Sequence, residues 1–234
     1  MEKTAALQIL FGRLPPLEGR FDQYLDQGKC LKIFQNERIS FDREASQEPG
    51  VFYVQTGLLK LSVHRPLSAT GLDFCYYGER TILERRTAAS LSGCGRMYIE
   101  ACENTIAYAF SQREFFELLG KDRALLEQYH QLYAAQLSLL FRRMELTACL
   151  DAEQRVVGWL IQLCRQSTPD GEGGCFIPCR LTQQEIADYL LIHVTTFNRV
   201  FSELKKESIV EKKRSGFLVH DVERLQRFEE RLSI

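Results

Sequence analysis

Residues 181–210 read Leu-Thr-Gln-Gln-Glu-Ile-Ala-Asp-Tyr-Leu-Leu-Ile-His-Val-Thr-Thr-Phe-Asn-Arg-Val-Phe-Ser-Glu-Leu-Lys-Lys-Glu-Ser-Ile-Val. Thr182 and Glu185 have the spacing of a capping box, which predicts a helix that starts after Thr182. A short turn at 191–192 leads to a second helix from about His193, whose buried side carries Phe197, Val200, Phe201 and Leu204. Two short amphipathic helices joined in this way are typical of a helix-turn-helix.

The second helix leaves small polar side chains and one arginine on its exposed side. In a DNA major groove, arginine donates two hydrogen bonds to guanine and threonine contacts the methyl group of thymine. We therefore expect the following residues to read bases: Val194, Thr195, Thr196, Asn198 and Arg199.

A basic hairpin follows the second helix. Residues 209–220 alternate as two short strands, and Ser215–Gly216 is the predicted turn. Positive charge is concentrated here, although the whole chain has a net charge of only −1. We expect phosphate contacts from Lys212, Lys213 and Arg214 at the hairpin, and from Gln184 and His193 in the two helices.

The first half of the chain has a different periodicity. From about Lys29 to Phe110, short β-rich segments alternate with turns, which predicts a sandwich or a small barrel. Ser111 and Glu114 then form a second capping box, and a long helix follows from about Asp122 to Leu150.

Along the long helix, one stripe recurs at alternating steps of four and three residues, as in a coiled-coil seam. The stripe consists of Leu125, Tyr129, Leu132, Gln136, Leu139, Arg143 and Leu146. We expect it to join two copies of the chain, while a second apolar face, containing Leu126, Tyr133, Leu137, Leu140, Phe141 and Met144, packs on the barrel. The alternative is a helix that is buried within one subunit.

Length and composition fit two folded domains. The chain has 234 residues, of which 45% are hydrophobic and 26% are charged. No signal peptide and no apolar run of membrane-spanning length stands out, so we expect a cytoplasmic protein without a membrane partner. The eight cysteines are expected to be thiols that pack as small buried side chains.

In the order of its elements, and most specifically over Leu181 to Val219, the chain resembles the CRP/FNR family of bacterial regulators. The resemblance implies an α+β fold: a cyclic-nucleotide-binding-type β-roll at 1–116, a dimerisation helix at 117–150 and a winged helix-turn-helix at 151–234. It implies that Arg199 contacts a base and Thr182 a phosphate. It also implies a homodimer on a palindromic site in double-stranded DNA, with RNA polymerase as a partner.

The sequence departs from the family pattern at several positions. Leu191 stands where the family usually has glycine in the turn, and Thr195 replaces an acidic residue that many members use, so the common target sequence does not transfer. A subset that regulates halorespiration is locally similar in Ile192-His-Val-Thr-Thr, in Lys205-Lys-Glu-Ser-Ile and in Tyr76-Tyr77-Gly78.

The sensor domain lacks part of a cyclic nucleotide site. Gly78-Glu79 is present, but no Arg-Ser or Arg-Thr pair follows at the family's spacing, so we expect no cyclic AMP binding and interpret Gly78-Glu79 as a β-turn. The dispersed cysteines and histidines predict no metal or other cofactor. A small organic effector is the remaining ligand, in a pocket that contains Tyr76, Tyr77, Tyr133, Leu137 and Phe141.

Two other classes of function fit the sequence less well. A cupin-like barrel enzyme needs several histidine and carboxylate ligands on neighbouring strands, whereas only His64 of the four histidines lies in the barrel region. A protein-interaction module that uses its helix-turn-helix for protein contacts does not explain the basic hairpin. We therefore expect a regulator without enzymatic activity.

Overall fold

The structure is a computed structural model that describes residues 14–40, 50–64, 71–85, 96–167, 173–179 and 181–232. The described residues form two compact units, which divide between Leu140 and Phe141 inside a long helix. The three-part division expected from the sequence, at 1–116, 117–150 and 151–234, stays a prediction.

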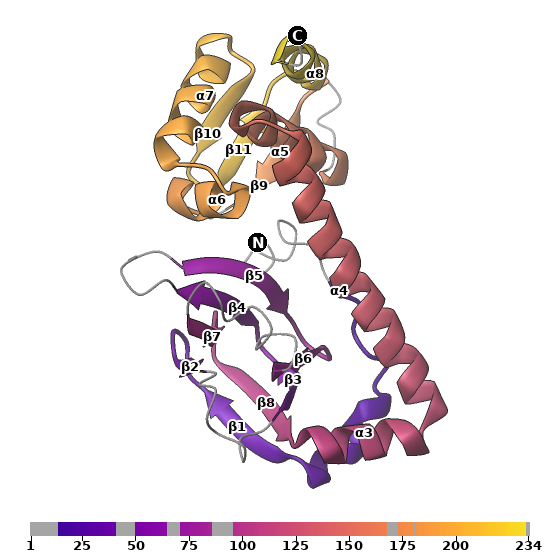
Figure 1. Ribbon diagram of the computed structural model, residues 1–234. Helices are drawn as coiled ribbons and strands as arrows, with labels where there is room; N and C mark the ends of the chain where they lie inside the picture. The colour runs from indigo at the N-terminus through magenta and orange to yellow at the C-terminus, as the bar shows by residue number, and fades with distance from the viewer. Residues whose placement is uncertain are drawn as a thin grey trace. The chain divides into compact units, whose positions relative to one another are not determined.

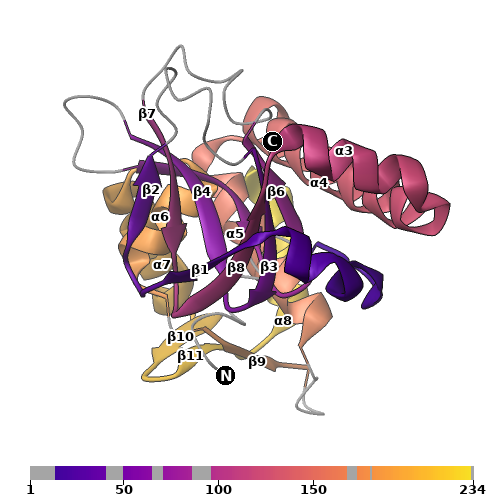
Figure 2. The ribbon, with the colours of Figure 1, turned by 90° about the horizontal axis from the view of Figure 1, so that it is seen from below.

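The N-terminal unit is a roll of two antiparallel sheets, preceded by the 3-10 helix η1 (Arg20–Gln27) (Figure 1). The first sheet has the strand order β1-β8-β3-β6, and β1, β8 and β3 lie next to one another in Figure 2. The second sheet has the order β2-β7-β4-β5. The strands are β1 (Lys29–Ile33), β2 (Arg38–Ser40), β3 (Val51–Thr56), β4 (Leu59–His64), β5 (Gly71–Tyr77), β6 (Ile82–Glu84), β7 (Arg96–Ala101) and β8 (Thr105–Phe110).

Both sheets contribute side chains to one hydrophobic core. Because successive side chains of a strand point to opposite faces, every second residue of β4 enters this core: Leu59, Leu61 and Val63. The turn between β3 and β4 requires Gly57, whose φ is +95°. A Cβ atom at this position would lie 2.5 Å from Thr105 Oγ1. The β-roll expected from the sequence is therefore confirmed.

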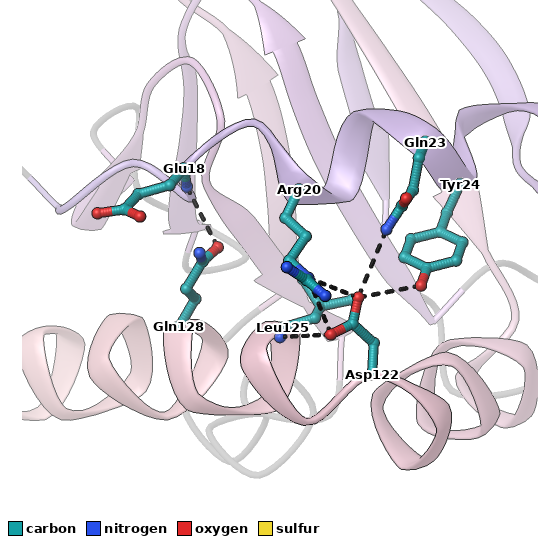
Figure 3. Close-up of polar contacts among 7 residues, drawn as sticks. All are labelled: Glu18, Arg20, Gln23, Tyr24, Asp122, Leu125 and Gln128. Atoms are coloured by element: carbon teal, nitrogen blue, oxygen red, sulfur yellow. Dashed lines mark hydrogen bonds and ion pairs between the residues drawn. The ribbon is translucent and has the colours of Figure 1, made fainter.

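Helix α3 (Gln112–Lys121) begins at the predicted capping box, in which the Ser111 side chain accepts from the Glu114 N–H. Asp122 separates α3 from helix α4 (Arg123–Cys149) and is nearly buried. Its carboxylate lies 2.8 Å from Arg20 Nε and 3.1 Å from the Tyr24 hydroxyl, and it also accepts from the backbone N–H of Leu125 (Figure 3). Asp122 therefore ties η1 to the start of α4.

One face of α4 packs on the roll of the same chain. Leu125 and Leu132 are 0% and 1% exposed and belong to the roll's core, against which Leu139 also packs. The Tyr129 hydroxyl donates to Glu84, and Gln136 Nε2 donates to the Ile82 carbonyl at 3.2 Å. Leu125 and Leu132 are therefore not available to the predicted dimer seam, because the roll of their own chain covers them, whereas Tyr129, Gln136 and Leu139 are only partly covered.

The last two members of the predicted seam are also engaged within the chain. The Arg143 guanidinium carbon lies 6.0 Å from the centre of the Tyr189 ring, and Leu146 faces helix α5 (Ala152–Gln166) across a cavity. The opposite face of α4 is the exposed one: Leu126, Tyr133, Leu137, Phe141 and Met144 are 38–66% exposed. The sequence revealed two apolar stripes, and the roll covers the stripe that we expected to be free for a second copy of the chain.

The C-terminal unit combines helices with a small sheet of order β10-β11-β9. Its further elements are β9 (Cys175–Pro178), α6 (Gln183–Leu190), α7 (Val194–Lys206), β10 (Val210–Lys213), β11 (Gly216–Val219) and α8 (Val222–Leu232). Trp159, Phe197, Phe201 and Phe217 pack edge to face or stacked in its core. Strand β9 was not predicted, since it follows a Gly-rich segment that reads as a loop.

Candidate nucleic-acid interface

Helix α6 starts as the sequence predicts. The Thr182 Oγ1 accepts from the Glu185 N–H at 3.1 Å, and the Glu185 carboxylate accepts from the Thr182 N–H at 2.8 Å. This reciprocal pair satisfies two backbone donors at the helix start. Ile186, Ala187 and Leu190 are buried, whereas Thr182 and Gln184 are exposed. The two proposed phosphate-binding side chains of α6 therefore lie at its exposed beginning.

The turn between α6 and α7 depends on one strained residue. Leu191 caps α6 with φ 54° and ψ 45°, which is the left-handed conformation. Its N–H donates to the Ala187 and Asp188 carbonyls. A side chain in this conformation costs about 1–2 kcal/mol, which glycine avoids. Leu191, which stands where the family usually has glycine, therefore adopts the backbone conformation that glycine favours, and this lowers the stability of the fold.

Helix α7 presents one apolar and one polar face. Phe197, Val200, Phe201 and Leu204 are buried, as predicted. The predicted base-reading residues lie on the remaining surface: Thr195, Asn198 and Arg199 are exposed, and Val194 and Thr196 are half-buried. His193 is the N-cap, and its Nδ1 accepts from the Thr195 N–H at 3.3 Å. The polar face is thus available to a macromolecule.

Arg199 forms ion pairs with two carboxylates. Its Nη2 donates to Glu153 Oε1 at 2.5 Å, and its Nη1 donates to Glu203 Oε1 at 3.5 Å. The hydrogen bond that Arg199 donates to Glu153 is also the largest cause of the raised pKa of the Arg199 guanidinium. Both ion pairs occupy guanidinium donors that a bidentate contact with another acceptor would need. Sequence reasoning missed Glu153, because it lies in the first turn of α5, 46 residues upstream.

The predicted hairpin is β10 and β11, which pair from Val210–Val219 to Lys213–Gly216. The turn residues are Arg214 and Ser215, one position earlier than predicted, because Gly216 already belongs to β11. A Cβ atom on Gly216 would lie 2.0 Å from the Ile177 carbonyl oxygen of β9. Glycine is therefore required for the sheet rather than for the turn.

The charges of the hairpin are not equivalent. Lys213 Nζ lies 2.6 Å from Glu211 Oε2, and this contact lowers the pKa of the Glu211 carboxyl. Lys212 and Arg214 are also exposed, and neither forms an ion pair with any described residue. Since Glu211 partly offsets the charge of Lys213, the other two residues are the stronger phosphate-binding candidates.

The five residues of the expected effector pocket have different surroundings. Tyr76 and Tyr77 are neighbours on β5 and point to opposite faces of the sheet. Tyr77 belongs to the roll's core, whereas the Tyr76 hydroxyl donates to Asp73 at 2.7 Å. Tyr133, Leu137 and Phe141 lie on the exposed face of α4. The pocket stays a prediction, and it relied on a different face of α4 contacting the roll.

Gly78 and Glu79 lie in a turn, as expected. The Thr81 N–H and hydroxyl both donate to the Gly78 carbonyl, at 3.2 and 2.6 Å, and Glu79 is exposed. The Arg86-Thr87 pair that bears on the cyclic AMP prediction lies outside the described residues. That prediction remains open.

The cysteines only partly follow their prediction. Cys164, Cys175 and Cys179 are buried, whereas Cys30 and Cys149 are exposed. Among the residues that the structure describes, no three His, Cys, Asp or Glu side chains gather in a way that suits a metal ion. Within the same ranges, no helix combines the length and hydropathy of a membrane span.

Comparison with known proteins finds a matching domain family and several similar solved structures. Residues 154–228 match the Crp-like helix-turn-helix domain family. A structure of CprK complexed with OCPA has a TM-score of 0.72 to this chain at 18% identity, covering 89% of this chain and 94% of CprK. A CooA mutant from Carboxydothermus hydrogenoformans has a TM-score of 0.73 at 17% identity, covering 92% of this chain and 96% of CooA.

FixK2 from Bradyrhizobium japonicum is a third similar structure, with a TM-score of 0.57 at 20% identity, covering 86% of this chain and 96% of FixK2. No curated protein sequence matches the chain. The β-roll, long helix and winged helix-turn-helix are the fold of the CRP/FNR regulators. This chain has that fold and carries a Crp-like helix-turn-helix domain, so the resemblance expected from its sequence is confirmed.

Proposed function

We propose that the protein is a transcription regulator that binds a palindromic promoter site in double-stranded DNA as a homodimer. The observation that carries this proposal is the exposed polar face of α7, which lies in a Crp-like domain with an exposed basic hairpin. A recognition helix that enters the major groove and a hairpin at the phosphates are the usual division of labour in such domains.

Each contact has a separate role in the proposal. Base edges are read by Arg199, with Val194, Thr195, Thr196 and Asn198 beside it. Phosphates are bound by Thr182, Gln184, His193, Lys212, Lys213 and Arg214, which position the helix without reading sequence.

The dimer forms through the exposed face of α4 in place of the seam expected from the sequence. Leu126, Tyr133, Leu137 and Met144 recur at the steps of a coiled-coil seam, and Phe141 flanks them. Phe141 and Met144 are 66% and 63% exposed in the single chain, and pairing with a second α4 removes such side chains from water. A two-fold axis along this seam gives two recognition helices for two half-sites.

The test is a DNA-binding measurement over a series of salt concentrations, with sedimentation of the same sample. The proposal predicts a dimer at micromolar concentration whose affinity for a selected duplex falls steeply as salt rises, because bound phosphates release counterions. Binding that does not depend on salt, or a monomer that binds a single half-site as tightly, contradicts it.

We also propose that the β-roll receives a small organic effector and that the regulator contacts RNA polymerase. The effector is supported by the fold shared with CprK, which was solved in complex with OCPA. Thermal unfolding with and without OCPA tests the roll as a binding site, since a ligand that binds only the folded state raises its stability. In vitro transcription from a selected site tests the contact with polymerase.

A further inference from the structure

The C-terminal unit contains a cavity away from the polar face of α7. Its volume is about 240 Å³, and it lies between the end of α4 and the length of α5, with contributions from α6 and α8. All of its lining residues lie between Arg142 and Glu229, within one compact unit. For comparison, an apolar cavity of roughly 150 Å³ takes up benzene. The space therefore suits a compound with a single ring.

The charge around the cavity is mainly positive. Arg142, Arg143, Arg155 and Arg165 line it, and Glu229 is its only lining carboxylate. In the part of the chain that the structure describes, Arg142 and Arg165 form no ion pair with an acidic side chain. Guanidinium groups bind carboxylates and phosphates through paired hydrogen bonds, so this lining favours an anion.

The remaining wall is apolar and aromatic. Trp159 is 5% exposed and lines the cavity together with Leu146 and Ile161. The Trp159 Nε1–H is buried and has no acceptor among the described residues. Buried indole N–H groups usually have a hydrogen-bond partner, so an acceptor on a ligand would complete this site.

We propose that this cavity binds a small organic oxyanion, which carries a carboxylate or phosphate group on a body of about one aromatic ring. The oxyanion pairs with Arg142 and Arg165, and the ring lies against Trp159. The site adjoins the helix-turn-helix, because Arg155 Nη1 donates to the carbonyls of Leu190 and Leu191 at 3.0 and 3.2 Å. A bound anion therefore lies beside the side chain that holds the turn before the recognition helix.

Trp159 is the only tryptophan of the chain, so its fluorescence reports on the cavity directly. The experiment titrates the full-length protein with benzoate, phenyl phosphate and inorganic phosphate at constant ionic strength set by sodium chloride. We expect a saturable change with benzoate or phenyl phosphate, and affinity for inorganic phosphate weaker by at least roughly ten-fold, because it has no ring to bury. Equal affinity for inorganic phosphate, or no saturable change with either aromatic anion, overturns the proposal.

A double variant, Arg142→Gln with Arg165→Gln, tests the assignment of the anion site. Both side chains are exposed, so the fold is expected to survive. The variant should bind the aromatic anion at least roughly ten-fold more weakly. Arg123→Gln on the same helix, whose side chain is 91% exposed and outside the cavity, should bind as the wild type does. Unchanged affinity in the double variant contradicts the site, and the readout requires no DNA, so either result is independent of the proposed DNA binding.

Discussion

The exposed faces of α4 and α7 differ in their chemistry. One exposed stripe of α4 consists of large apolar side chains, of which Phe141 and Met144 are each more than half exposed. On α7 they are small and polar, with one arginine held by two carboxylates. Apolar side chains are stabilised by leaving water, whereas arginine and small polar side chains match the edges of bases. The two faces therefore suit the two different partners that we propose, a second α4 and a DNA groove.

The largest expected effect comes from charging the exposed face of α4. Leu137→Asp with Phe141→Asp places two carboxylates in the proposed seam and should weaken dimerisation by at least roughly 100-fold. Sedimentation velocity measures this directly, and DNA affinity should fall with it because one half-site is lost. The control is Gln131→Asp with Ser138→Asp, which adds the same charges at exposed positions beside the seam. If the two double variants dimerise equally well, the proposed dimer interface on the exposed face of α4 is contradicted.

A second effect is expected at Asp122, which joins η1 to the start of α4. The hydrogen bond from Arg20 is the largest cause of the lowered pKa of Asp122. A carboxyl whose pKa is lower in the folded state stabilises the fold above its unfolded pKa of about 4, and this contribution is lost as pH falls through the folded value. Asp122→Asn should therefore lower the Tm at pH 7, and its difference from the wild type should narrow below about pH 4.

Asp26→Asn is the control for Asp122, because Asp26 lies on η1, is exposed and forms no ion pair with the described residues. Its Tm should follow that of the wild type at every pH. A constant difference between the Asp122 variant and the wild type from pH 7 to pH 3 rules out the ion pair as the cause.

A smaller effect, on DNA affinity, is expected at Glu153, which in our proposal competes with DNA for Arg199. Glu153→Gln removes the shorter ion pair and a negative charge close to the DNA, so affinity for the selected duplex should rise roughly two- to five-fold. Glu203→Gln, whose contact with Arg199 is longer at 3.5 Å, should produce a smaller rise. Fluorescence anisotropy at a fixed salt concentration measures the DNA affinities of both variants and of the wild type. A fall in affinity for Glu153→Gln indicates that Glu153 orients Arg199 for binding instead.

The smallest effect concerns the turn between the two helices. Leu191→Gly should raise stability by about 1 kcal/mol, because glycine adopts the left-handed conformation without a steric penalty. Leu191 is 37% exposed, so little buried apolar contact is lost. Gln184→Gly, at an exposed position inside α6, should lower stability by about 1 kcal/mol. Urea unfolding of both variants checks these opposite signs.

The helix-turn-helix was predictable because its signals are local. The capping box at Thr182 and the spacing of Phe197, Val200, Phe201 and Leu204 fix where the helices start and which face is buried. Strand β9 was missed because its pairing with β11 is long-range and its four residues carry no periodic signal. Glu153 was missed for the same reason, since only the tertiary fold brings it to Arg199.

The faces of α4 could not be assigned from the sequence. Both stripes have heptad spacing, and periodicity reveals a buried face without revealing its partner. The roll covers Leu125 and Leu132, whereas Leu126 and Leu137 are exposed. Nothing in the spacing of these four leucines predicts that difference. The effector pocket prediction relied on this assignment, since three of its five residues lie on the exposed face of α4.

The central claim, that Arg199 reads a base, is tested by selecting binding sites from randomised duplexes with the wild type and with Arg199→Ala. A bidentate contact to guanine is worth roughly 1–3 kcal/mol of discrimination, so the variant should lose its preference at one position in each half-site. These positions should form a symmetric pair about one helical turn apart. Ser202→Ala, on the same exposed face, should keep the wild-type preferences. An unchanged preference in the Arg199 variant would contradict the account.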